Sequence, residues 1–156
     1  MRCLHHSKRR RARGFTMIEV LVSLLVVSFG LLALIGLQAT AVRLSTDARD
    51  RGAATFLADQ LLGRMLISNP LNAAAWAHNP SGTTCSPTAA ATSNAMVTAW
   101  LGEVARQLPN AEESAQQVIV RDAALGDIDV VLCWKRGRDP NEPSHSLIVR
   151  NRVQWQ

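Results

Sequence analysis

An apolar stretch directly after a basic tract limits what this 156-residue chain can fold into. From Phe15 to Leu37 the only ionisable side chain is that of Glu19. A helix needs about 20 apolar residues to cross a bilayer, whereas the core of an ordinary signal peptide has about 7 to 15. The stretch is therefore predicted to stay in a membrane as a transmembrane helix.

The basic tract before this stretch indicates membrane orientation rather than nucleic-acid binding. Six of the 17 Lys and Arg residues precede Phe15, so a chain that begins at Phe15 has 11 basic against 12 acidic residues. The positive charge thus belongs to the leader and not to the remaining protein. Positive residues hold the adjacent end of a membrane helix in the cytoplasm, so the rest of the chain is expected on the other side.

The single acid of the apolar stretch, Glu19, needs a physical reason to be there. A carboxylate near the end of a membrane helix costs on the order of 2 to 3 kcal/mol and is therefore a functional hypothesis. One interpretation is a capping box, in which Thr16 and Glu19 satisfy backbone N–H groups. Another is an ion pair with an amine, which cleavage after Gly14 would create at Phe15, one helical turn away. Both interpretations stay open at this point.

Residues 14–23, Gly-Phe-Thr-Met-Ile-Glu-Val-Leu-Val-Ser, follow a short basic leader. This combination resembles the class III signal of type IV prepilins and pseudopilins. The resemblance implies that a prepilin peptidase cuts between Gly14 and Phe15 and methylates the new amine of Phe15. It also implies that Glu19 pairs with a terminal amine, its own or that of a neighbouring subunit, during filament assembly.

Residues 27–38 further resemble PilV-type minor pilins, also called type IV pilus modification proteins, and Cys133-Trp134 agrees with this subfamily. The resemblance implies a low-abundance subunit that helps to prime pilus assembly. The implied partners are other major and minor pilins, prepilin peptidase, the assembly platform in the inner membrane, and membrane lipid. The implied location is the bacterial inner membrane, with the head in the periplasm, and then the pilus at the cell surface.

Three alternatives remain beside the pilin interpretation. A minor pseudopilin of a type II secretion system has the same leader, anchor and small head. A membrane-tethered periplasmic enzyme or binding module would use Phe15 to Leu37 only as an anchor. Secretion with cleavage after Ala41 is suggested by the A-x-A pattern of residues 39–41.

Apolar periodicity predicts that the helix continues beyond the membrane to about Ser68, where Asn69-Pro70 closes the pattern. The expected divisions are a leader over 1–14, a transmembrane half over 15–38, an amphipathic half over 39–68 and a periplasmic head over 69–156. Glycines 30, 36 and 52 are weak points in this helix. The apolar residues of the amphipathic half are Val42, Leu44, Ala48, Ala54, Leu57, Leu61, Met65 and Leu66.

The rest of the chain predicts a small α+β head. Residues 70–92 have the composition of an exposed loop with little regular structure. A short helix follows, with Ser93 or Asn94 as its cap and Pro109 at its end. Valine- and isoleucine-rich segments predict three antiparallel strands over 117–121, 128–134 and 146–155. The predicted fold class is α+β and pilin-like, with the long helix packed on this sheet. The helix stripe expected to face the core is Met96, Val97, Trp100, Leu101, Val104 and Leu108.

Removal of the leader also settles the odd cysteine count. Cys3 would leave with the leader, so the mature chain would have two cysteines in an oxidising compartment. A disulfide between Cys85 and Cys133 is predicted, worth roughly 4 kcal/mol in the chain-entropy model. Two free thiols are the alternative.

The sequence offers no catalytic motif, so the chain is not expected to be an enzyme or to hold a cofactor. His78 and His145 lack the spacing of metal ligands, and no metal is expected. Asp127 with Asp129 is interpreted as a solvated strand edge. The basic segment 135–139 is interpreted as a solvent-exposed hairpin turn.

Overall fold

The computed structural model describes residues 14–68, 70–137, 139 and 141–154, so Cys3 and most of the predicted leader lie outside the described residues. The chain divides into two units, with the boundary between Leu44 and Ser45. Helix α1 (Met17–Leu66) belongs to both units and ends two residues before the predicted boundary. Each unit is considered by itself below.

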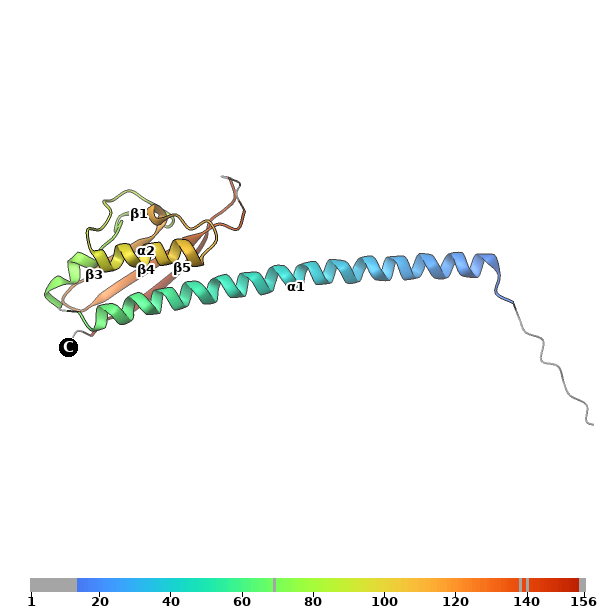
Figure 1. The fold of residues 1–156 in the computed structure, drawn as a ribbon, viewed down its shortest axis with the longest axis horizontal. Coiled ribbons are helices and arrows are strands. Elements are labelled where there is room, and N and C mark those ends of the chain that lie inside the picture. The colour runs from blue at the N-terminus through green and yellow to red at the C-terminus, as the bar shows by residue number, and fades with distance from the viewer. Residues whose placement is uncertain (1–13, 69, 138, 140, 155–156) are drawn as a thin grey trace, which may run out of the picture. The chain divides into compact units, whose positions relative to one another are not determined.

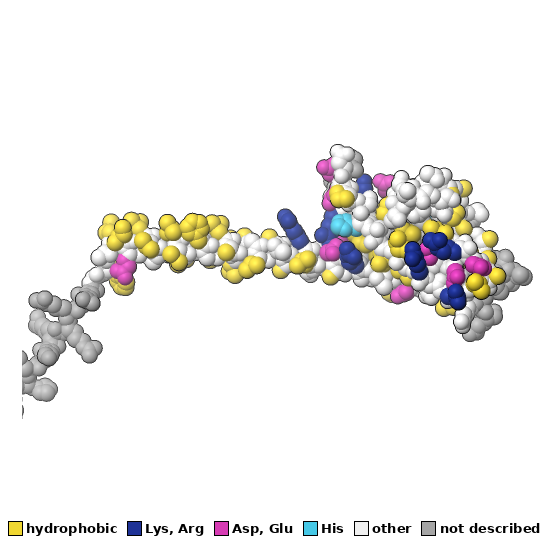
Figure 2. All heavy atoms as spheres, turned by 180° about the vertical axis from the view of Figure 1, so that it is seen from behind, with side chains coloured by type: hydrophobic (Ala, Val, Ile, Leu, Met, Phe, Trp, Pro, Cys, Tyr) yellow, Lys and Arg dark blue, Asp and Glu magenta, His cyan; other side chains and the backbone are white. Residues whose placement is uncertain are grey.

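The first unit is the apolar part of α1. Residues 14–44 are exposed throughout, and yellow apolar side chains cover this segment in Figure 2. Its hydroxyl groups are satisfied within the helix, because Ser23, Ser28 and Thr40 donate to backbone oxygens three or four residues earlier at 2.7–3.0 Å. In the described part of the chain, α1 is the one helix whose length and composition suit a membrane span. The helix continues through Gly30 and Gly36 without a break.

The second unit, the head, contains the remainder of α1 and all the other elements (Figure 1). Its central sheet is antiparallel with strand order β3-β4-β5, which confirms the predicted α+β architecture. The observed bounds of the three strands lie within three residues of the predicted ones, and Trp155 lies outside the described residues. In chain order the elements are η1 (Pro70–Trp76), β1 (Gly82–Thr83), β2 (Ser86–Pro87), α2 (Ala95–Gln107), η2 (Glu113–Ala115), β3 (Gln117–Asp122), β4 (Asp127–Trp134) and β5 (His145–Arg152).

The hydrophobic core lies between one face of this sheet and the two helices. Helix α2 is fixed to α1 by a buried hydrogen bond, in which Trp100 Nε1 donates to the Leu57 carbonyl oxygen at 2.8 Å. Burial of these large side chains supplies most of the favourable free energy of folding the head. The α1 residues in the core are Ala54, Leu57, Ala58, Leu61, Leu62 and Met65, and those of β4 are Ile128, Val130, Leu132 and Trp134.

Helix α2 begins as its sequence predicts. Asn94 is extended at φ −72° and ψ 117°, and its side-chain oxygen accepts a hydrogen bond from the Met96 N–H at 2.9 Å. This cap satisfies one of the free backbone donors at the start of the helix. The expected core stripe is confirmed for five of its six residues, but Met96 is 54% exposed and was wrongly assigned.

The prediction of an irregular exposed loop over residues 70–92 was wrong for the first part of the segment, whereas none of residues 80–92 is buried. The segment contains η1 and the β1-β2 hairpin, and Trp76, His78 and Asn79 are buried. His78 pairs with Val118 as an isolated antiparallel bridge at the edge of β3. The amide of Asn79 donates to the backbone oxygens of residues 114 and 116 at 3.1 and 3.3 Å. The polar composition of this segment indicates a solvated loop, but the buried polar side chains hydrogen bond to buried backbone groups rather than to solvent.

Candidate processing and assembly site

The predicted cleavage residues lie just before α1. Gly14, Phe15 and Thr16 are not helical, and the Phe15 side chain is 81% exposed. A peptidase needs an accessible, non-helical segment, since a regular helix keeps its backbone groups hydrogen bonded. The geometry around Gly14 and Phe15 thus fits a cleavage site.

Thr16 caps the start of α1. The Glu19 N–H donates to the Thr16 carbonyl oxygen at 3.1 Å and lies 3.4 Å from the Thr16 hydroxyl oxygen. This is one half of the capping box considered from the sequence. In the described residues no backbone N–H donates to the Glu19 carboxylate, so the other half of the box is not formed.

The Glu19 carboxylate is consequently available to a partner. It has no hydrogen bond or ion pair within the described part of the chain, and the first unit is exposed around it. The residue stands in the first turn of α1, one helical turn after Phe15. An amine at the start of a chain that begins with Phe15 could therefore reach a carboxylate on the same helix or on a neighbouring one.

The structure joins Cys85 and Cys133, the pair predicted from the sequence, by a disulfide. The two Cα atoms are 5.5 Å apart, within the normal range for this bond. Cys85 lies in the β1-β2 turn and has a left-handed backbone, with φ +63°. Cys133 is a buried residue of β4. The bond therefore holds the hairpin of the connecting segment against the central strand.

An ion-pair cluster between α1 and the β4-β5 connection escaped sequence reasoning. Arg136 NH2 lies 2.7 Å from an Asp47 oxygen, and Arg136 Nε lies 3.6 Å from an Asp50 oxygen. Asp50 is only 9% exposed. The interpretation of residues 135–139 as a purely solvent-exposed turn was thus wrong for Arg136, whose side chain is 28% exposed. Arg136 lies close to Asp139 and Glu142 in the sequence. This local charge pattern does not indicate a contact with Asp47, which lies nearly 90 residues earlier.

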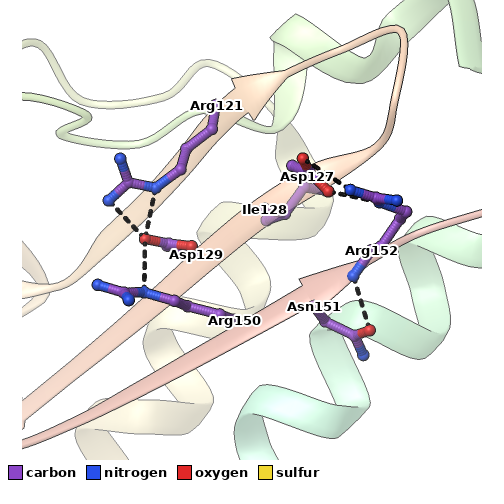
Figure 3. A pocket seen from close by; sticks show the side chains of 7 residues that line it. All are labelled: Arg121, Asp127, Ile128, Asp129, Arg150, Asn151 and Arg152. Atoms are coloured by element: carbon purple, nitrogen blue, oxygen red, sulfur yellow. Dashed lines mark hydrogen bonds and ion pairs between the residues drawn. The ribbon is translucent and has the colours of Figure 1, made fainter.

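A second charged cluster lies at one end of the sheet face that points away from the helices (Figure 3). Asp129, on the central strand, is bound by Arg121 of β3 at 2.7 Å and by Arg150 of β5 at 3.4 Å. Its side chain is 5% exposed, so the interpretation of Asp129 as a solvated edge was wrong. Two arginines are needed on one carboxylate because a buried charge is costly unless it is paired.

Asp127 lies beside this cluster, and its side chain is 34% exposed, so it is only partly solvated. Arg152 Nε donates to Asp127 at 2.7 Å, and this hydrogen bond holds the pKa of the Asp127 carboxyl below its ordinary value. The same bond raises the pKa of Arg152. Over the described residues, no group of three or more His, Cys, Asp or Glu side chains is placed to hold a metal ion.

Comparison with known proteins gives one finding on the leader. Residues 9–35 match the model of the prokaryotic N-terminal methylation motif. No curated protein and no solved structure matches the chain significantly. The match includes Gly14, Phe15 and Glu19 and all but the last two residues of the apolar stretch.

The leader motif and the α+β architecture define a pilin-like protein with a helix suited to a membrane anchor. The leader motif, more particularly, supports a type IV pilin- or pseudopilin-like substrate of prepilin peptidase. Such a leader implies processing by that peptidase and assembly with other pilins.

Proposed function

We propose that this chain is a minor pilin of a type IV pilus that takes part in priming pilus assembly. The single observation that carries the proposal is the methylation motif over residues 9–35, with a Glu19 carboxylate that no described residue pairs. Desolvation of an unpaired carboxylate is costly, whereas pairing with an amine offsets much of that cost. Docking of the helix against neighbouring subunits is therefore favoured in the register that brings an amine to Glu19.

The likeness of residues 27–38 to PilV-type minor pilins supports a minor role. In this proposal, prepilin peptidase cuts between Gly14 and Phe15 and methylates Phe15. The processed chain is then anchored in the inner membrane with its head in the periplasm. The apolar surface of the first unit then leaves lipid and packs against other pilins. The chain acts by assembly and is not an enzyme. A minor pseudopilin of a type II secretion system is the second candidate, because it has the same leader, anchor and small head.

The proposal is tested with the full chain in a piliated host that lacks its own copy. Replacing Glu19 with Ala should leave leader cleavage largely intact and lower the amount of subunit in sheared fibres at least tenfold. Glu19→Asp is the matched control, because it retains the charge and should restore part of the incorporation. Replacing Gly14 with a bulky residue should instead leave the uncut precursor in the membrane.

Two outcomes would contradict the proposal. Normal incorporation of the Glu19→Ala chain would remove the assigned role of Glu19. Absence of the wild-type chain from sheared fibres, together with a loss of protein secretion when the chain is deleted, would favour the pseudopilin alternative.

A further inference from the structure

Residues 88–92, the strap, connect the β1-β2 hairpin to α2 (Figure 1). Both ends of the strap are fixed. The disulfide between Cys85 and Cys133 holds the hairpin before it, and the Asn94 cap starts the helix after it. No residue of the strap itself is buried. The strap is therefore held by hydrogen bonds rather than by apolar packing, which is typical of segments that open locally.

The strap forms part of the wall of a surface hollow of about 530 Å³. The rest of the wall comes from α2, from η2 and from the segment before β1, and it includes the buried residues Leu101 and His78. Release of the strap would enlarge this hollow and would bring Leu101, a residue of the core, closer to solvent.

His78 binds the strap through its ring and the sheet through its backbone. Its N–H donates to the Val118 carbonyl oxygen at 3.0 Å, and the Val118 N–H donates back at 2.8 Å. From the strap, the Thr92 N–H donates to His78 Nδ1 at 3.1 Å. The Asn79 N–H donates to the Ala90 carbonyl oxygen of the strap at 3.2 Å. Of these bonds, the one to the imidazole ring is the one that a proton can replace.

The hydrogen bonds define the protonation state of His78. A backbone N–H can only donate, so Nδ1 must accept from Thr92 and carries no proton. The neutral ring then has its proton on Nε2, which donates to the Glu113 carbonyl oxygen at 3.2 Å. The Asn79 amide nitrogen lies 3.0 Å from Nε2, but it gives its protons to two backbone carbonyl oxygens. The strap is therefore bonded to the neutral form of His78.

Protonation of His78 would break the bond to the strap. A proton on Nδ1 would point at the Thr92 N–H, so that two donors would face each other. His78 is only 3% exposed, and burial of an unpaired charge is costly. Among the described residues that line the hollow, Glu113 is the one other ionisable group, and it is exposed. The strap, η1, the lining residues of α2 and the facing residues 117–119 of β3 have uncharged side chains.

We propose that the strap is a pH-sensitive element of the head, bonded at neutral pH and released when acid protonates His78. Histidine side chains change their charge in the range of about pH 5 to 8. The open strap binds one proton more than the bonded strap, so the free energy of opening falls as the pH falls. Because the disulfide and the helix cap fix both ends, the strap can open while the head stays folded. The inference does not depend on the role of Glu19.

The first test compares amide hydrogen exchange in the full wild-type chain and in His78→Asn, both in detergent. The Asn side chain keeps an oxygen near the position of Nδ1 that can accept from Thr92, but it cannot gain a proton. We expect equal exchange at about pH 7.5 and, at about pH 5, at least roughly fivefold faster exchange of the Thr92 and Asn79 amides in the wild type. Comparison at one pH removes the pH dependence of the exchange chemistry itself.

Two controls accompany this measurement. The Val118 amide, which bonds to the His78 backbone, should exchange equally in both chains. His145→Asn removes the other histidine of the head, which stacks on Trp134, and should behave as the wild type does at both pH values.

Three results would overturn the proposal. The first is equal exchange of the Thr92 and Asn79 amides in the wild type and in His78→Asn at the lower pH. The second is an increase that includes Val118 to the same extent, since the head would then unfold as a whole. The third is an increase at Thr92 alone, since the strap would then have stayed in place.

Nitrogen NMR of the imidazole rings gives a second test that needs no variant. At neutral pH, His78 in the wild-type chain should carry its proton on Nε2, and its protonation should coincide with a shift of the Thr92 amide. A proton on Nδ1 at neutral pH, or a strap that opens while His78 stays neutral, would refute the proposal. Failure of either test leaves the Glu19 experiment unaffected, and the two ideas can therefore fail separately.

Discussion

At the scale of single residues, the head depends on carboxylates that the sequence does not mark as special. Asp50 and Asp129 are both nearly buried, and each is met by an arginine from a distant segment of the chain. Neither pair could be predicted, because Asp50 lies in an amphipathic helix rich in charge and Asp129 lies near the start of β4, two residues after another acid. Long-range pairing of charges is set by the tertiary fold and not by local pattern.

Replacing Arg136 with Met should destabilise the head by roughly 1 to 2 kcal/mol, because Asp50 would lose the cation beside it. The cost stays below that of a fully buried pair, since the Arg136 side chain is 28% exposed. Thermal unfolding of the detergent-solubilised chain measures the effect. Arg106→Met, which breaks the exposed pair with Glu103, should change stability by less than about 0.5 kcal/mol. Equal losses in the two variants would contradict the importance of the Asp50 contact.

Replacing Arg152 with Gln should raise the pKa of Asp127, because the hydrogen bond that lowers it is removed. A lowered carboxyl pKa in the folded state stabilises the head above the ordinary value of about 3.9, and this contribution is lost as pH falls through the lowered value. The acid-sensitive window of this pair thus lies below about pH 4. Carboxyl carbon shifts measured by NMR follow the titration. Arg150→Gln is the control and should leave Asp127 unchanged; an unchanged Asp127 in Arg152→Gln would refute the assignment.

At the scale of elements, periodicity predicts the regular parts of this chain well. The strands over 117–122, 127–134 and 145–152 and the Asn94 cap follow from β-branched runs and from cap chemistry. The connection over 70–92 does not, because its buried residues His78 and Asn79 bond to backbone groups of β3, η2 and Gln116 that are remote in sequence. Polarity alone cannot separate a solvated loop from one whose polar groups are internally bonded.

The disulfide should contribute stability mainly to the connection over residues 70–92. Its two cysteines are 48 residues apart, so its removal should cost up to about 4 kcal/mol in the chain-entropy model. The chain with Cys85→Ser and Cys133→Ser should unfold at lower temperature and should exchange its amides faster near β1 and β2. A single Cys→Ser variant should lose as much stability as the double one. Identical melting of the oxidised wild type and the double variant would show that the bond adds nothing.

At the scale of the whole molecule, one helix serves two environments. The part of α1 before Ser45 exposes apolar side chains and satisfies its hydroxyl groups internally, as a membrane segment must. The part after Leu44 buries Ala54, Leu57, Ala58, Leu61, Leu62 and Met65 in the core of the head, whereas Phe56 and Leu66 stay exposed. The sequence placed this change after Gln38, where charged residues enter the pattern, and the boundary between the two units lies six residues later. What it could not predict was where the charges would pair within the head.

The leader gives the sharpest prediction at this scale, because each fate of the chain produces a different N-terminus. Processing by prepilin peptidase makes the mature protein begin at Phe15 with a methylated amine, so mass analysis of the membrane-extracted chain should find that residue first. Coexpression with an inactive peptidase is the control and should leave the precursor uncut. A start at Val42 would indicate cleavage after Ala41 and release from the membrane. That result would leave Glu19 on the discarded fragment, where no amine of an assembled subunit could meet it.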